Sequence, residues 1–162
     1  MPRITPDGYS KVHFLPAVAS LAAPTVAEFA AGDELTPFLT RTGLDTPEEG
    51  TDADSSSLAS PRDFSVPATI GGDIVGEFYR DDTPANDDAW TTLPRLTEGF
   101  LAVGRFGGTG TDNALQATDP VEIYPVRVSQ RSSARLTGGE TQRFVARFAL
   151  SSDPDLAAVV TA

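Results

Sequence analysis

Hydrophobic and polar residues alternate along several stretches of the chain, and a period of two is typical of a half-buried β-strand. The clearest alternation is TQRFVARFAL, residues 141–150, where Phe144, Ala146, Phe148 and Leu150 share one face. Two arginines and a valine occupy the other face. This pattern predicts a strand with one face in a hydrophobic core.

Further stretches alternate in the same way between turn-forming residues. They are KVHFL (11–15), DFSVPATI (63–70), DIVGEFYRD (73–81), TEGFLAVGRF (97–106) and DPVEIYPVRVSQ (119–130). Another possible strand, near residues 34–40, is interrupted by Pro37, which suits a sheet edge. In residues 119–130 the apolar side chains change parity across Tyr124-Pro125, and this change predicts a bulge or a bend.

One segment has the pattern of a short helix. In APTVAEFAAGDEL, residues 23–35, Thr25 and Glu28 stand at the capping-box spacing. Val26, Phe29 and Ala30 form an apolar stripe at helical spacing. A helix of about two turns is unstable alone, so we expect the stripe to dock on a sheet face.

These elements predict a mainly β fold of six to eight strands with one helix. A β-sandwich or partly closed barrel with a flanking helix is the natural architecture. The 162 residues favour a single domain over 1–162. Residues 43–62 are acidic and rich in Ser and Gly, and we expect a long structureless interaction loop there. Residues 152–162 are expected to form a C-terminal arm.

Composition narrows the possible functions. The chain has no Cys, which excludes disulfides and thiolate metal sites, and it has no apolar run long enough to span a membrane. No Sec signal is visible at the N-terminus, so we expect a soluble product made in the cytoplasm, with no membrane insertion. The net charge is −11. Residues 1–90 carry 5 basic and 16 acidic residues, and residues 91–162 carry 7 of each, which suits self-association better than phosphate binding.

No group of residues points to catalysis. The single histidine, His13, lies in a strand without an apparent partner and is expected to be structural. The acids of residues 81–88 lack the order of an EF-hand loop. The glycine-rich stretch 104–113 lacks the Walker spacing and its lysine. We therefore expect no enzyme, no cofactor and no metal site, although a Ca²⁺- or carbohydrate-binding β-sandwich module remains an alternative.

The order of these elements resembles the major tail protein, or tail tube protein, of long non-contractile-tailed bacteriophages (siphophages). The resemblance covers roughly residues 10–150. It rests on a "PT…E" helix, a leucine-threonine stretch, a Gly-Leu turn and the later strands GFLAVGRF and DPVEIYPVRVSQ. The positions that match the helix, the stretch and the turn are Pro24, Thr25, Glu28, Leu35, Thr36, Gly43 and Leu44.

The resemblance implies a structural virion protein whose homohexameric rings stack into a tube for DNA ejection. Strands of neighbouring copies would close a barrel around an acidic lumen, through which DNA passes transiently and without specificity. The expected partners are a tape measure protein, a tail terminator and a distal tail protein, with assembly in the host cytoplasm. A neck or tail-completion ring protein of the same fold is the nearest alternative.

The resemblance also implies roles for particular residues. The loop over 43–62 would reach the next ring, whereas the docking of the helix is expected from its own apolar stripe and capping box. The expected inter-ring contacts are Asp45, Glu48, Glu49, Asp52, Asp54 and Leu58. The expected helix-docking residues are Thr25, Val26, Glu28 and Phe29.

Overall fold

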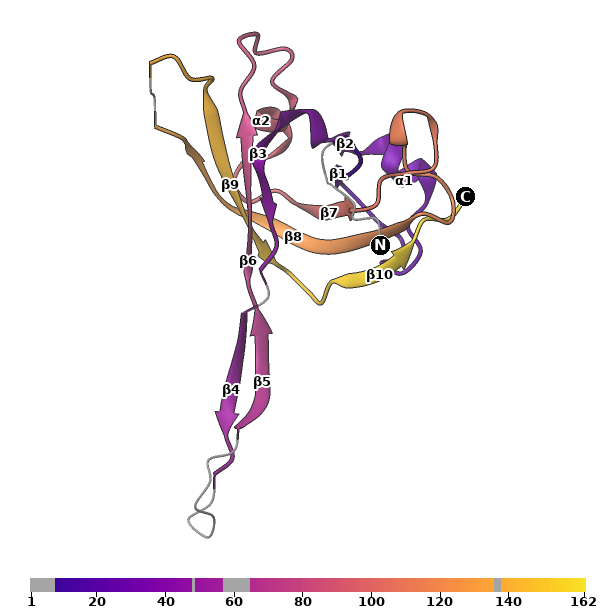
Figure 1. The fold of residues 1–162 in the computed structure, drawn as a ribbon, viewed down its shortest axis with the longest axis vertical. Coiled ribbons are helices and arrows are strands. Elements are labelled where there is room, and N and C mark those ends of the chain that lie inside the picture. Colours follow the sequence, from indigo (N-terminus) through magenta and orange to yellow (C-terminus); the bar gives the residue numbers. More distant parts are fainter. Residues whose placement is uncertain (1–7, 48, 57–64, 136–137) are drawn as a thin grey trace, which may run out of the picture.

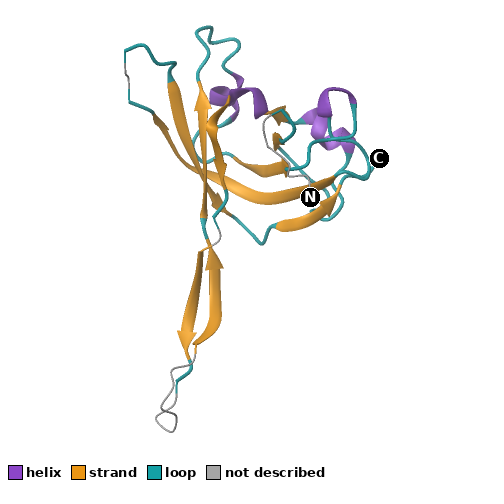
Figure 2. Cartoon of the chain, viewed as in Figure 1, coloured by secondary structure: helices purple, strands orange, loops and turns teal. Residues whose placement is uncertain are grey.

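A computed structural model describes residues 8–47, 49–56, 65–135 and 138–162, and the fold is mainly β (Figures 1 and 2). The strands are β1 Lys11–Leu15, β2 Asp33–Glu34, β3 Leu39–Asp45, β4 Glu49–Asp54, β5 Ser65–Gly71, β6 Asp73–Tyr79, β7 Glu98–Gly104, β8 Pro120–Ser133, β9 Arg143–Leu150 and β10 Asp155–Val159. The helices are α1 Val26–Ala31, α2 Asp88–Thr92 and the 3₁₀ turns η1 Thr36–Phe38 and η2 Thr111–Asn113.

Eight strands form one antiparallel sheet in the order β2-β1-β7-β8-β9-β6-β3. Strand β10 pairs with the start of β8 along the same edge that β9 occupies further on, so the 14 residues of β8 pair with three strands. Strands β4 and β5 make a separate two-stranded ribbon that extends away from the sheet (Figure 1).

The main core lies inside the curl of the sheet. Phe78, Phe144 and Phe148, on β6 and β9, are fully buried there and contact side chains that come from β1, β7 and β8. Ala89 and Leu93, within and just after α2, close this core. A sheet that surrounds one core from its first strands to its last is a partly closed barrel, as the sequence predicts.

A second core covers part of the opposite side of the sheet. It contains Ala102 of β7, Ile123 of β8 and Ala158 of β10, and Phe29 of α1 closes it. Strands β7 and β8 are therefore buried on both faces near their junction. This explains the change of apolar parity along β8, because its first apolar residues face the second core and its later ones face the first.

Of the bulge or bend predicted at Tyr124-Pro125, the bulge is wrong. Strand β8 pairs with β7 without interruption from Glu122 to Arg127. The register shift lies later, between Val128 and Gln130 on the β9 side.

Two other predicted elements also differ. Pro37 lies in η1, between β2 and β3, because proline is favoured in the first turn of a helix and cannot donate to a ladder. Residues 155–159, in the expected C-terminal arm, instead form β10, which pairs with β8 and buries Ala158 in the second core.

Candidate functional site

His13 is a structural histidine of β1. Its ring meets Phe29 edge to face, with 5.4 Å between ring centroids. Its Nδ1 is buried without a hydrogen-bond partner among the described residues, and burial lowers the pKa of the imidazole. No described group of three or more His, Asp or Glu side chains is arranged to hold a metal ion. No helix in the described part of the chain is long and apolar enough to cross a membrane.

The most prominent feature is an arm that continues two strands of the sheet. Strands β3 and β6 pair as far as Asp45 and Val75, and the β4–β5 ribbon begins directly beyond them with the pair Glu49 and Gly71. Figure 1 shows the ribbon projecting far beyond the barrel. Residues 50–56 are all exposed. We call residues 45–72 the arm.

Part of the expected interaction loop is thus a strand. The prediction of a structureless connection over 43–62 is wrong, because β4 pairs with β5 from Glu49 to Asp54. Asp52 and Asp54 are two residues apart in β4 and therefore share one face of the ribbon. Glu48 and Leu58 lie outside the described residues.

A second notable surface is the side of β8, β9 and β6 that neither core covers. The pairing between strands places three rows of side chains on it, each running from β8 through β9 to β6. The rows are Arg127, Ala149 and Asp73; Gln130, Arg147 and Val75; and Ser132, Val145 and Glu77. Tyr79 with Arg143 and the β7 residue Glu98 extend the face. We call this the bare face.

The bare face carries charges of both signs, and the exposed Asp45 of β3, paired with Val75, adds a further carboxylate at its edge. Three carboxylates, of Asp73, Glu77 and Glu98, stand against three guanidinium groups, of Arg127, Arg143 and Arg147. Two ion pairs join them, Arg127–Glu98 at 2.9 Å and Arg143–Glu77 at 3.4 Å. Thr42 and Thr40 donate hydrogen bonds to Glu77 that lower the pKa of its carboxyl.

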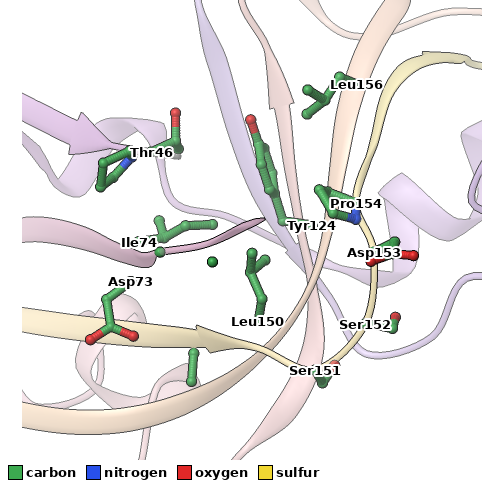
Figure 3. Close-up of a pocket in the computed structure, with 14 residues that line it drawn as sticks. Thr46, Asp73, Ile74, Tyr124, Leu150, Ser151, Ser152, Asp153, Pro154 and Leu156 are labelled. Atoms are coloured by element: carbon green, nitrogen blue, oxygen red, sulfur yellow. The ribbon is translucent and has the colours of Figure 1, made fainter. Parts of the chain in front are cut away.

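A pocket of about 590 Å³ lies where the arm leaves the barrel (Figure 3). Tyr124, Leu150 and Leu156 line it, with Thr46 at the start of the arm. The hydroxyl of Tyr124 donates a hydrogen bond to Glu122 at 2.8 Å, and burial raises the pKa of this phenol. Arg105 bonds both Glu122 (2.6 Å) and Thr46 (2.9 Å), which ties the base of the arm to β8.

The opposite end of the barrel carries a cluster of arginines around one indole. The guanidinium carbons of Arg80 and Arg131 lie 3.8 and 3.6 Å from the ring centroid of Trp90 in α2. Arg80 forms a salt bridge of 2.5 Å with Asp87, which is only 3% exposed. Arg131 donates to the backbone oxygen of Trp90 at 2.6 Å. Burial and the neighbouring Arg80 lower the pKa of Arg131.

A model of the phage tail tube protein family matches residues 1–162. The chain belongs to this family. It is thus a structural component of a phage tail within the virion, and this part of the prediction from the sequence resemblance is confirmed. No curated protein matches the chain.

Solved structures share the fold of this tail tube protein. A chain of the anti-feeding prophage baseplate is 10% identical, with a TM-score of 0.57, over 98% of this chain and 97% of that chain. A chain of the tail of an empty gene transfer agent particle, computed with C6 symmetry, is 9% identical, with a TM-score of 0.57, over 96% and 100%. A chain of the native gene transfer agent virion is 11% identical, with a TM-score of 0.51, over 78% and 89%.

The helix of this tail tube protein has the geometry that its sequence predicts. The hydroxyl of Thr25 accepts the N–H of Glu28 at 3.2 Å, and the Glu28 carboxylate accepts the N–H of Thr25 at 2.7 Å. Phe29 is 6% exposed in the second core, and Val26 packs against that core. Ala30, expected in the same stripe, is exposed because the helix rests on the sheet along a narrow line.

Sequence reasoning missed the bare face and the Arg80–Trp90–Arg131 cluster. Arg143 and Arg147 lie on one face of β9, whereas the register shift after Val128 puts Arg127 and Arg131 on opposite faces of β8. The rows form only through pairing between strands that are distant in the chain, and no local pattern encodes that pairing.

Proposed function

We propose that this tail tube protein forms homohexameric rings that stack into the tube of a long non-contractile tail, through which DNA leaves the capsid. The arm carries this proposal. An isolated two-stranded ribbon is marginally stable in water, so a ribbon that projects from the barrel calls for a binding partner. In a stack of identical copies, that partner is the copy in the next ring.

Lateral closure of each ring follows from the edges of the sheet. Strand β3 pairs with β6 on one side, and among the described strands nothing pairs with its other edge. Exposed edges invite pairing with another chain. We infer that β3 of one copy lies against the neighbouring copy and that six copies form a closed wall.

The bare face is our candidate for the lumen wall. It carries many charged side chains, it includes β6, which continues into the arm, and with Asp45 at its edge its four carboxylates nearly offset its three guanidinium groups. This assignment replaces the acidic lumen with a nearly charge-balanced one. Such a wall neither holds nor strongly repels phosphates, which suits transient passage of DNA.

The proposal extends to partners and place. The tube would enclose a tape measure protein, end at a tail terminator and join a distal tail protein, with assembly in the host cytoplasm. The role is structural and not enzymatic.

Electron microscopy of an arm-deleted variant tests the proposal. Residues 49–71 are replaced by an Asn-Gly turn, which suits a two-residue hairpin between β3 and β6. We expect the wild type to form tubes at high concentration, and the variant to stay folded but form no tubes.

Circular dichroism and thermal unfolding supply the control for folding. Normal tubes from the variant would refute the role of the arm. Single rings from the wild type that never grow would assign the alternative, a neck or tail-completion ring.

A further inference from the structure

The two ends of the barrel carry complementary groups. Strand β6 runs from Asp73, where the arm joins, to Tyr79, and Arg80 follows it directly. The arm and the Arg80–Trp90–Arg131 cluster therefore lie at opposite ends of one strand, as Figure 1 shows for the arm and α2. Head-to-tail stacking brings the arm of one copy toward the cluster end of the next.

The cluster end carries charges of both signs, but one of its cations has no ion-pair partner among the described residues. Its exposed acids are Asp81 and Asp82 in the β6–α2 loop and Asp88 at the start of α2. Arg80 is paired with Asp87, but Arg131 forms no ion pair with a carboxylate in the described part of the chain. The backbone oxygen and the ring of Trp90 hold the Arg131 side chain in place, and the residue is only partly buried. A fixed, partly exposed guanidinium is well suited to bind a carboxylate.

The arm supplies carboxylates on one face. Asp52 and Asp54 are exposed neighbours on the same face of β4. The six residues of β4 span about 20 Å, so this face reaches well past the end of its own barrel.

From this complementarity we propose that Arg131 of one copy receives the Asp52–Asp54 face of the arm from a copy in the next ring. The inference rests on the stacked-ring function proposed above and names the surface that the arm contacts. Trp90 acts as a positioning residue that holds Arg131 toward the approaching arm.

A charge-swap experiment tests this contact. The variants are Asp52→Arg with Asp54→Arg, Arg131→Glu, and all three substitutions together, with tube growth followed by light scattering and electron microscopy. Each reversal alone should reduce growth at least about tenfold, because like charges across an interface oppose binding. The combined variant should recover growth, because the pairs are restored with opposite sign.

Matched variants control for fold and for total charge. Arg131→Lys keeps the charge but loses the stacked guanidinium, so its growth should fall between that of the wild type and that of Arg131→Glu. Asp112→Arg reverses an exposed acid in η2 and should leave growth unchanged.

Crosslinking keeps the inference testable if Arg131→Glu fails to fold. The chain has no native Cys, so Asp54→Cys with Ser133→Cys introduces one defined pair. Ser133 is exposed and lies two residues from Arg131 on the same face of β8. Oxidation during growth should yield a ladder of linked copies, whereas Asp54→Cys with Asp112→Cys should stay unlinked.

Each result separates the two proposals. If the wild type forms tubes, any one of three results would overturn this contact and leave the tube function standing. These are unimpaired growth of Arg131→Glu, no recovery of growth in the combined variant, and no ladder of linked copies. A wild type that never forms tubes would overturn both.

Discussion

Asp119 shows how one buried carboxylate organises a whole connection. It is 3% exposed, and its Oδ2 accepts the backbone N–H groups of Thr109 (2.9 Å) and Gln116 (2.7 Å). These bonds close the loop between β7 and β8, which lies beside the second core. Although burial alone raises the pKa of this carboxyl, the backbone hydrogen bonds outweigh it, so the pKa is lowered.

We predict that Asp119→Ala lowers the free energy of unfolding by about 1–3 kcal/mol, because buried N–H donors lose their acceptor. The lowered pKa gives stability that is present above the unfolded pKa and is lost as the pH falls through the folded pKa. Urea unfolding at neutral and acidic pH measures both effects. The difference between wild type and variant should shrink in acid, and a difference that stays constant would contradict this role.

At the scale of elements, sequence patterns within a segment predicted the strands and the helix cap that depend on that segment alone. Strands β1, β6 and β9 and the cap of α1 follow from periods of two or from a capping box that spans four residues. Strand β4 was missed because TDAD has little strand propensity and is ordered by pairing with β5. Strand β10 was missed because its partner is β8, far away in the chain.

The docking of α1 is tested by Phe29→Ala. Phe29 closes the second core, so its truncation should cost about 3–5 kcal/mol. Ala30→Ser, on the exposed side of the same helix, is the control and should change stability little. Chemical denaturation measures both variants. A near-neutral Phe29→Ala would mean that α1 is peripheral to the fold.

At the scale of the whole molecule, the acidic excess lies away from the bare face. The chain has a net charge of −11, whereas the bare face, with Asp45 at its edge, carries four carboxylates and three guanidinium groups. The net charge follows from the sequence, but the face of the sheet on which each charged residue lies does not, because the faces are defined only by pairing between distant strands. The same reason explains why the acidic lumen seemed the natural expectation.

We predict that Glu98→Lys makes assembled tubes retain DNA. The substitution shifts the bare face by two positive charges per copy, and the side chain of Glu98 is 68% exposed, so folding should be unaffected. Binding of short DNA duplexes to assembled tubes, measured at low and high salt, checks this. Asp112→Lys, outside the bare face, is the control. Equal binding by both variants would exclude the bare face as the lumen wall.

The continuity of β6 with the arm has a mechanical consequence. Strand β6 lies between β9 and β3 and is hydrogen-bonded to both. Tension applied along the arm therefore loads these bonds in shear, all together, instead of peeling them apart one at a time. Under the proposed stacking, a tube joined by such arms would resist stretching through these hydrogen-bonded strands and would bend at the junctions between copies.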